Sequence, residues 1–551
     1  MPNRQRHPRI VARTAATLAA LSVSIGAALT AVTPASAASP LWAQHVQKYP
    51  GGITNGVRAY ATPEYASAQS TLARARAQLA AAPTSSKKGG LHNVQMDVNT
   101  NPPVPQNETS VAASLANPLV AVAGANDYVT GGVTVMRTLD GGNSWSTVRV
   151  VPQFRGTGDF CTGGDPWVAY SRRDKAFYLS QLCFFRSLPF SEVHLFKSID
   201  NGQTWTPGRF ASLADTNFDY ATGTVDASIF HDNDQVAIDN NPSSPHYGRI
   251  YVTHVKFHIL PTGFSDYCPV QLAYTDSVPT ANPRLAVWQH TQVVPDNPGG
   301  NGLGPTANQW PRPVVEPNGT LDIAYALEDC NTGLDTHFNF QKSTNGGASV
   351  MANPVQIDGA GEYVDNPDLG DVLPPTKFRA PDSTSLSYNQ ALGTLGFVYQ
   401  NNRDQTTSGA NISFEMSADG GHHWSAMKYI SITPGGAPAP EDQFFPALTS
   451  LSNGTFVAIW LDRRHDPQNR DIETFQGVST NGGATWTNQD ISTTPWNPDQ
   501  GFFRSGAFIG DYDGIASSTE AIYPTWTDGR NSQFSQTGQG STDIFTNVER
   551  Q

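Results

Sequence analysis

The sequence predicts an all-β fold built from repeated units of short strands. Among its 551 residues are 49 Gly and 40 Pro, and only 15% are charged. This composition suits a chain with many turns and differs from that of coiled coils and long-helix proteins. The chain is also too long for one ordinary compact core, and a short motif recurs along it. These observations favour either several domains or one large repetitive domain.

Residues 1–37 predict a signal peptide. Four arginines (Arg4, Arg6, Arg9 and Arg13) precede an apolar stretch from Ala15 to Val32, and the small-residue site Ala35-Ser36-Ala37 follows. We therefore expect a secreted, extracellular protein. No later segment approaches the roughly 20 apolar residues of a membrane helix, so no membrane association is predicted.

The charge balance excludes general binding to nucleic acids. The formal net charge is −13, and loss of the four arginines of residues 1–37 makes it more negative. Polyanions such as nucleic acids and anionic membrane surfaces repel such a chain. We expect a monomer that carries any anionic ligand only at a local basic site.

The four cysteines predict two disulfides. An even number of cysteines in an exported chain favours disulfides, and the spacing lacks the CxxC pattern of a zinc site. We expect Cys161 to pair with Cys183 and Cys268 with Cys330, because each pair closes a loop within or between neighbouring repeats.

Residues 38–93 predict a helical N-terminal extension followed by a linker. The Ala-rich stretch 62–82 carries Leu72 and Leu79 seven residues apart, which favours one helix, and a linker follows from Pro83 to Gly90. A collar or a spacer are the two interpretations, and no chemistry is predicted for this region.

An octapeptide recurs five times after this extension. It consists of a small hydroxyl residue, any residue, Asp or Asn, any residue, Gly, any residue, usually a hydroxyl residue, and Trp, which one copy lacks. The Asp or Asn side chain can cap a tight turn, Gly supplies a positive φ, and Trp can pin the turn onto the next strand. The copies are 138–145, 198–205, 343–350, 417–424 and 479–486.

The octapeptide matches the Asp box, or bacterial neuraminidase repeat, and residues 94–551 thus resemble the β-propellers of the sialidase-like superfamily. The resemblance implies four-stranded blades in which the box joins the third and fourth strands, on the face opposite the ligand site. It also implies that the box residues are structural, not catalytic. These residues are Asp140, Asp200, Asn345, Asp419 and Asn481.

The spacing of the boxes favours seven blades, with six as the alternative. One gap of 145 residues hides a unit without a box, in which GRIYVTHVKFH and PVQLAYTDS predict strands. The stretch after Trp486 adds three strands without a fourth. The alternation of Val94, Met96 and Val98 predicts the missing strand, which would close the ring and remove open sheet edges.

The resemblance implies a glycan site at the propeller mouth, with a carboxylic acid, a tyrosine nucleophile and a glutamate base. Asp165 is the preferred acid, since a carboxyl beside Trp167 can have a raised pKa. Tyr512 is the preferred nucleophile and Glu441 its base. The alternatives are a turn cap at Asp165 and a tyrosine packed in an inner strand at Tyr512.

Arginines predict a carboxylate clamp at the same face. Arg403, Arg464 and Arg530 each follow an Asp or Asn by two residues after the second strand of consecutive blades, and Arg379 lies in the nearest match to the family's Phe-Arg-Ile-Pro motif. Asp234 and Asp511 complete the candidate substrate-binding set. The alternative is that each arginine braces an Asp of its own repeat, which the repetition of the pair favours.

No cofactor is predicted. The spacing of His231, His258 and His465 predicts no metal site. Asp365, Asp368 and Asp371 are candidate ligands for a structural Ca²⁺, with a solvated acidic loop as the alternative.

Three functions remain in view. The first is a secreted sialidase-like glycoside hydrolase, similar to exo-α-sialidases, and the second is a polysaccharide lyase. The third is a non-catalytic propeller that binds a glycan or a protein, which a filled mouth would favour.

Overall fold

A computed structural model describes most of the chain after residue 38. The described residues are 39–49, 51–61, 91–129, 131–294, 308–363, 365, 372, 373, 375, 378–402, 409–503, 506–534 and 540–550. The helix predicted over residues 62–82 lies outside them. Among the described residues the structure is almost entirely β, which confirms the predicted fold class.

Seven antiparallel four-stranded sheets follow one another along the chain, so the preferred count of seven blades is confirmed over the alternative of six. Blades one to four comprise β2 (Ser110–Ala113), β3 (Ala121–Asp127), β4 (Gly132–Thr138) and β5 (Ser146–Val150); β6 (Trp167–Ser171), β7 (Ala176–Phe184), β8 (Ser191–Ser198) and β9 (Ser212–Thr216); β12 (Ile229–Ile238), β13 (Ile250–Ile259), β15 (Val270–Thr275) and β16 (Gln289–Gln292); and β17 (Gln309–Val315), β18 (Leu321–Glu328), β19 (Asp335–Ser343) and β20 (Val355–Gln356). Blades five to seven comprise β23 (Thr384–Asn389), β24 (Thr394–Asn401), β25 (Asn411–Ser417) and β26 (Lys428–Tyr429); β27 (Gln443–Ser450), β28 (Phe456–Asp462), β29 (Glu473–Ser479) and β30 (Thr487–Asp490); and β33 (Gly514–Ser517), β34 (Ala521–Asp528), β35 (Asp543–Thr546) and β1 (Val94–Gln95).

Short elements accompany the blades. They are β14 (Ser265–Tyr267) beside β13, β36 (Glu549–Arg550) beside β34, the ribbons β10 (Phe218–Asp219) with β11 (Thr224–Val225), β21 (Val372–Leu373) with β22 (Phe378–Arg379) and β31 (Phe502–Phe503) with β32 (Gly506–Ala507), and the 3₁₀ turns η1 (Gly208–Phe210), η2 (Pro283–Leu285) and η3 (Pro498–Gly501).

The ring closes where the sequence predicted. In β1, Val94 pairs with Thr546 and Gln95 with Phe545, so the outermost strand of blade seven comes from the N-terminal side of blade one. The backbone N–H of Met96 continues the ladder by donating to the carbonyl of Ile544 over 2.8 Å. Each first strand of a blade contacts the first strand of the next, and β33 contacts β2. Pairing β1 with β35 therefore completes the four strands of blade seven and closes the ring between blades seven and one.

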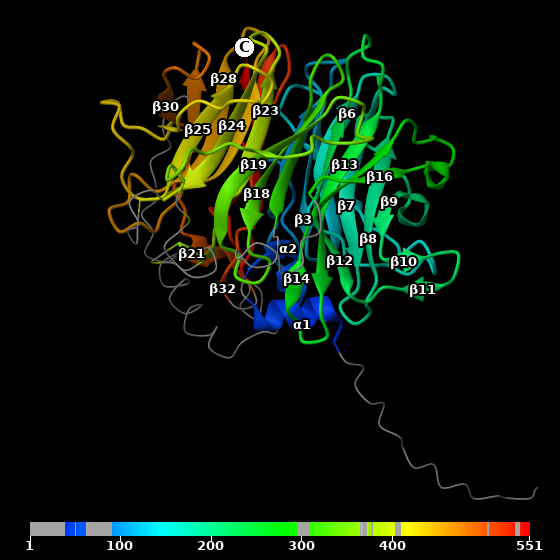
Figure 1. Cartoon of the computed structure of the whole chain (residues 1–551). Helices are drawn as coiled ribbons and strands as arrows, with labels where there is room; N and C mark the ends of the chain where they lie inside the picture. The colour runs from blue at the N-terminus through cyan, green and yellow to red at the C-terminus, as the bar shows by residue number, and fades with distance from the viewer. Residues whose placement is uncertain are drawn as a thin grey trace, which may run out of the picture. The chain divides into compact units, whose positions relative to one another are not determined.

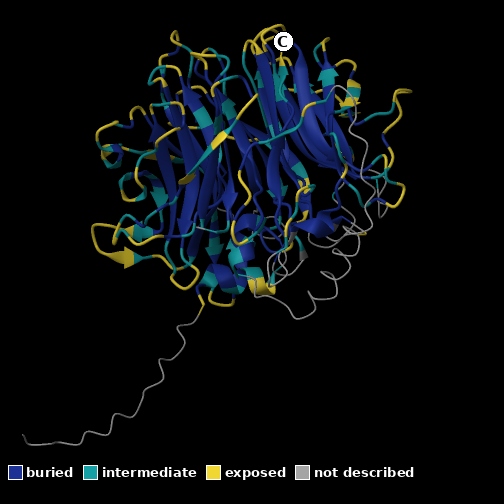
Figure 2. Cartoon of the chain, turned by 180° about the vertical axis from the view of Figure 1, so that it is seen from behind, coloured by how far each residue is buried: buried dark blue, intermediate teal, exposed yellow. Residues whose placement is uncertain are grey.

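The core lies between the faces of neighbouring blades. The second strand of most blades is buried on both faces, as in β24 and β28, and therefore consists of nearly continuous apolar residues. Figure 2 shows the buried strands in dark blue and the exposed residues concentrated in the connecting loops. The predicted strands of the unit without a box are β13 and β15 of blade three.

Each of the five octapeptides connects the third and fourth strands of its blade. Because neighbouring strands are antiparallel, these turns lie at the end of each sheet opposite the end where its first strand begins. We call the latter end of the ring the mouth.

Two helices precede the ring: α1 (Leu41–Lys48) and α2 (Asn55–Ala61). Figure 1 shows them in blue, together at one end of the strands. Among the described residues, no helix has the length and apolar character needed to cross a bilayer.

Candidate functional site

Four carboxyl groups and one arginine gather at the mouth, and we call them the mouth cluster. Glu108, Asp165 and Asp511 each lie shortly before the first strand of their blade, Asp232 lies within β12, and Arg379 lies in β22 before blade five. All five are buried. Ring closure therefore brings together residues that are up to 403 positions apart in the sequence.

The chain's own N-terminal extension fills this mouth. We call residues 51–57, which include the start of α2, the mouth segment. The hydroxyl of Thr54 lies 2.9 Å from Oδ2 of Asp165 and 2.8 Å from Oδ1 of Asp232, and its backbone N–H donates to Oδ2 of Asp232 over 2.8 Å. The first turn of α2 supplies two more donors, because the N–H of Asn55 reaches Asp511 over 2.6 Å and that of Gly56 reaches Glu108 over 3.1 Å.

Acceptors on the mouth segment complete the contacts. The guanidinium of Arg379 donates to the carbonyl of Ile53 over 2.6 Å, and the side-chain amide of Gln309 donates to the carbonyl of Gly52. Together these bonds join residues 52–56 to blades one, two, three, four, five and seven. The mouth segment thus occupies the position that the sequence assigned to a ligand.

Apolar side chains anchor the segment. The indole of Trp42 in α1 lies 5.2 Å, between ring centroids, from both Phe184 and Phe230. Ile53 and Val57 are fully buried. Because burying one such side chain stabilises by about 1.5–3 kcal/mol, the extension is a packed part of the fold.

Two glycines allow the segment to approach the ring closely. A Cβ on Gly51 would lie 1.8 Å from the backbone nitrogen of Gly333, and one on Gly52 would lie 2.2 Å from the carbonyl oxygen of Cys330. Gly52 also has a φ of +84°. A side chain at either position would therefore prevent the mouth segment from packing as observed.

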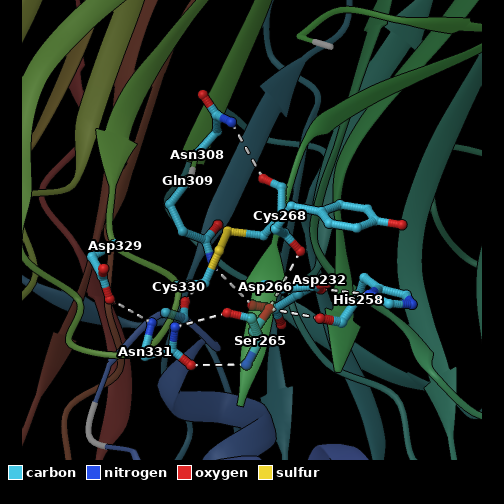
Figure 3. Close-up of a disulfide and its surroundings, with 12 residues drawn as sticks. Asp232, His258, Ser265, Asp266, Cys268, Asn308, Gln309, Asp329, Cys330 and Asn331 are labelled. Atoms are coloured by element: carbon cyan, nitrogen blue, oxygen red, sulfur yellow. Dashed lines mark hydrogen bonds and ion pairs between the residues drawn. A yellow bond between two sulfur atoms is a disulfide. The ribbon is translucent and has the colours of Figure 1, made fainter. Parts of the chain in front are cut away.

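A disulfide supports the loop that receives these glycines. Cys268 of blade three is bonded to Cys330 of blade four, and Cys161 is bonded to Cys183 in blade two, so both predicted pairs are confirmed. Figure 3 shows Asn331 next to the Cys268–Cys330 disulfide, where the Asn331 side chain exchanges hydrogen bonds with the backbone of Ser265. The carbonyl of Asn331 accepts the N–H of Gly51 over 3.1 Å.

The mouth carboxyl groups have raised pKa values. Burial is the main cause at Asp165, Asp232, Glu108 and Asp511. Neighbouring carboxylates add to it at Asp165 and Glu108, whereas Arg379 opposes it at Asp511. The pKa of Asp232 is raised to about 6. A raised pKa favours the protonated form of a carboxyl group, which is the form that a general acid needs.

Tyr512 lies beside this cluster and is buried. Its ring centroid is 5.8 Å from that of Trp167, and the guanidinium of Arg312 lies over both rings. Burial, followed by the charges of Asp165, Glu108 and Asp234, raises the pKa of Tyr512 well above its ordinary value. The buried carboxyl of Asp234 has a raised pKa for the same leading reason. The structure thus brings five of the predicted site residues into one region: Asp165, Tyr512, Arg379, Asp234 and Asp511.

The other predicted site residues lie elsewhere. Burial and then Asp442 raise the pKa of Glu441, and neither Tyr512 nor a member of the mouth cluster is among the groups that act on it. Arg464 is bound through its own repeat: Nε and Nη2 donate to Asp462 over 2.9 Å and 2.6 Å. Arg530 is bound in the same way to Asp528 over 2.9 Å and 2.6 Å. Arg403 lies outside the described residues.

A groove between blades five and six contains Arg464. It encloses a cavity of about 940 Å³ between β26 and β30, lined by Tyr429, Phe475 and Trp486 among others. The guanidinium of Arg464 lies 4.0 Å from the ring centroid of Phe475. This arginine therefore belongs to the outer side of the ring, away from the mouth segment.

The octapeptide turns contain a repeated hydrogen-bond pattern. In the first copy, Oδ1 of Asp140 accepts the hydroxyl of Thr138 over 2.8 Å and the N–H of Ser144 over 3.0 Å. Asp200, Asn345, Asp419 and Asn481 repeat both contacts. Each such side chain closes its own turn, at the end of the sheets away from the mouth.

The candidate Ca²⁺ ligands are only partly visible. Oδ2 of Asp365 accepts the backbone N–H of Asp335 over 3.0 Å, and Asp368 and Asp371 lie outside the described residues.

Sequence reasoning missed Glu108 and Thr54. Glu108 lies before the first strand of blade one, the position that Asp165 has in blade two, so aligning the blades could have found it. Glu108 and Asp165 also share a positive φ, 55° and 53° respectively, which is uncommon outside glycine. No local signal identifies Thr54, because its role depends on how the extension folds back onto the ring.

Comparisons with known proteins place the chain near several propeller enzymes in structure only. No family model matches the sequence, and no curated protein matches it. The Hadza microbial sialidase Hz136 shares 13% identity over 78% of this chain and 73% of that chain, with a TM-score of 0.42. The Penicillium chrysogenum α-L-arabinanase complexed with arabinobiose shares 13% identity over 74% of this chain and 99% of that one, with a TM-score of 0.41.

A third similar structure is the Trypanosoma rangeli sialidase in complex with the inhibitor DANA. It shares 10% identity over 72% of this chain and 57% of that one, with a TM-score of 0.42. At these identities and scores the comparisons assign no activity.

Proposed function

We propose that the protein is a secreted glycoside hydrolase that acts at the mouth through a pair of carboxyl groups. The observation that carries the proposal is the hydroxyl of Thr54, which lies within hydrogen-bond distance of both Asp165 and Asp232. One hydroxyl carries one proton and can donate to only one carboxylate. The second contact is satisfied if the other carboxyl is protonated and donates to the hydroxyl oxygen.

This arrangement is that of an acid and a base around a hydroxyl. In the proposed reaction, the protonated Asp165 gives its proton to the leaving glycosidic oxygen. The ionised Asp232 attacks the anomeric carbon as its bond to the leaving oxygen breaks. A water that gives a proton back to Asp165 then cleaves the glycosyl ester and releases the sugar. Oδ2 of Asp165 and Oδ1 of Asp232 can be no farther apart than the sum of their distances to the Thr54 hydroxyl oxygen. That limit fits the separation of about 5–5.5 Å in retaining glycosidases and is too short for inverting ones.

The charge of the mouth favours a neutral glycan. Glu108, Asp165, Asp232 and Asp511 surround the segment, and Arg379 is the only one of the described clamp arginines with a contact there. The clamp predicted for a sialic acid carboxylate is therefore not assembled among the described residues. The raised pKa of Tyr512 also disfavours a phenolate nucleophile, which leaves this role to a carboxylate.

Substrate can enter only after the mouth segment leaves. Thr54, Asn55 and Gly56 satisfy the carboxyl groups that the reaction requires. The enzyme would thus be secreted in a latent form. The two disulfides agree with an oxidising, extracellular location.

The buried anchors of the segment favour a second candidate function. Trp42, Ile53 and Val57 are buried as deeply as the core, which suits a propeller whose mouth is filled permanently. Such a protein would bind glycans or proteins through another surface without catalysis.

One experiment separates the two functions. The Gly51→Ala protein should not seat the mouth segment, because its Cβ would collide with the backbone of Gly333. We expect it to release reducing sugar from members of a neutral glycan panel at least about tenfold faster than the parent chain. The exposed Gln47→Ala is the matched control in the same extension and should leave the rate unchanged.

Hydrogen exchange at residues 51–57 and circular dichroism would show that the segment is released from a folded ring. Adding Asp165→Asn to Gly51→Ala should abolish turnover. A folded, opened variant with no activity on any glycan would refute the hydrolase and support the second candidate. Absorbance from unsaturated uronates in the same assay would indicate lyase chemistry instead.

A further inference from the structure

Three histidines and one aspartate converge at the boundary between blades two and three. Asp215 lies in β9, His231 in β12, His254 in β13 and His290 in β16. Nε2 of His254 lies 2.9 Å from Oδ2 of Asp215, and Nε2 of His231 lies 3.7 Å from the same oxygen. Nε2 of His290 lies 3.9 Å from Oδ1. Three of the 13 histidines of the chain thus face one carboxylate.

The core of this group is buried and compact. The side chains of His231 and His254 are almost fully buried, whereas Asp215 is partly open to solvent. Ligand atoms of Asp215, His231 and His254 all lie within 4.8 Å of one another. A metal ion at bonding distances of about 2.0–2.2 Å would need contacts of roughly 3.3–3.5 Å between its ligands, so small side-chain adjustments suffice.

The contacts within this group fit either hydrogen bonds or a bound metal ion. Nε2 of His254 lies within hydrogen-bond distance of Asp215, whereas Nε2 of His231, at 3.7 Å, lies farther away. Ser191 Oγ lies 3.3 Å from Nδ1 of His231. If that nitrogen carries the proton, Nε2 of His231 presents a lone pair to the Asp215 carboxylate, and a cation between the two groups would remove their repulsion. A hydroxyl behind a ligating imidazole is also the usual outer partner that fixes its tautomer.

We propose that Asp215, His231 and His254 bind one divalent transition metal ion, with Zn²⁺ as the best fit. Two imidazoles and a carboxylate are the ligands that zinc prefers, whereas Ca²⁺ and Mg²⁺ favour all-oxygen sites. The exposed side of Asp215 gives the ion an entry path, and a water can supply the fourth ligand, because Nε2 of His290 is already hydrogen-bonded to the carbonyl of Ala214. The ion would link the outer strand of blade two to blade three, directly behind Asp232 of the mouth.

The chain contains a comparison group. His465, Glu473 and Asp490 also bring ligand atoms within 4.8 Å of one another. However, this group offers one imidazole and two carboxylates, and the His465 side chain is 58% exposed. It is therefore a poorer zinc site, and His465→Gln is a matched control.

The test uses the full-length secreted protein, stripped with a chelator and titrated with Co²⁺ as a spectroscopic substitute for zinc. We expect about one ion per chain and visible ligand-field bands of tetrahedral intensity. His231→Gln and His254→Gln should each weaken Co²⁺ binding at least about tenfold, whereas His465→Gln should not. Zn²⁺ should raise the melting temperature of the parent chain and displace Co²⁺.

Because a substitution in the buried pair can also destabilise blade three, Asp215→Asn, at the partly open position, serves as a second variant. It should remain folded by circular dichroism and lose the cobalt bands. The proposal is overturned if the parent chain binds no Co²⁺ stoichiometrically, or if folded His254→Gln and Asp215→Asn proteins bind it as the parent does. It does not depend on glycan turnover, so an inactive mouth would leave it standing.

Discussion

The two ends of the propeller sheets use the same side chain, aspartate, in opposite ways. At the octapeptide turns, Asp419 is exposed, and hydrogen bonds from His423 hold its pKa below the ordinary value. At the mouth, burial and the neighbouring Asp232 raise the pKa of Asp165. A turn aspartate is satisfied by residues within its own octapeptide, whereas a mouth aspartate depends on groups from distant blades. Hydrogen bonds within one turn thus lower the pKa of the turn aspartate, whereas burial beside another carboxyl group raises the pKa of the mouth aspartate.

The largest expected effect tests whether the mouth end depends on the N-terminal extension. Trp42→Ala should lower the free energy of unfolding by about 3–5 kcal/mol, because it removes a buried ring that packs on Phe184 and Phe230. Denaturant unfolding would measure the loss. Val287→Ala, at an exposed apolar residue, should change stability by less than about 0.5 kcal/mol. An equally small effect of Trp42→Ala would mean that the extension is only loosely attached.

The next effect concerns pH at the mouth. The pKa of Asp232 is raised to about 6 in the fold, so the contribution of this group to stability is greatest below its unfolded pKa of about 4 and is lost as pH rises through about 6. Asn does not titrate. The free energy of unfolding of Asp232→Asn, relative to wild type, should therefore rise by about 2–3 kcal/mol between pH 4 and pH 7. Urea unfolding across this range checks it, and a flat difference would place Asp232 outside the buried cluster.

A smaller effect tests whether Arg464 stabilises its own repeat or binds a glycan carboxylate. Arg464→Lys keeps the charge but loses the planar fork that holds Asp462, so we expect a loss of about 1.5 kcal/mol. Thermal melting should detect this loss, and glycan turnover by the opened Gly51→Ala protein should not change. Weaker glycan binding with an unaltered melting temperature would assign Arg464 to the site.

The smallest effect concerns the turn end. Asp140→Ala should cost about 1 kcal/mol, the typical value for losing a capping side chain. Although slight burial opposes the shift, hydrogen bonds from Ser144 lower the folded pKa of Asp140, so the stabilisation is present above about pH 4 and fades as pH falls. Unfolding at pH 7 and pH 3 should show the gap closing, the reverse of the trend at Asp232. Loss of turnover in the folded variant would move the turn into the site.

These two ends also explain what the sequence could predict. The turns, the strand at Val94, both disulfides and the seven blades follow from local patterns or from counting repeats, and the structure confirms the strand, the disulfides and the blade count. The site was only partly predictable, because Asp165 and Tyr512 stand at blade entrances, whereas Thr54 reaches Asp165 and Asp232 through the folding of a remote extension. Convergence of His231, His254 and Asp215 likewise depends on strand register and blade contact, which single-sequence spacing does not encode.

The pairing of β1 with β35 also sets an order of events in time. Val94 is synthesised before blades one to six, whereas its partner Thr546 is synthesised after all of them. Blades one to six can form one after another, while β1 has no partner until β35 has been made. A chain that is cut short before β35 would therefore keep β1 unpaired, which invites aggregation and degradation. The closing strand thus makes synthesis of β35 a condition for a closed ring.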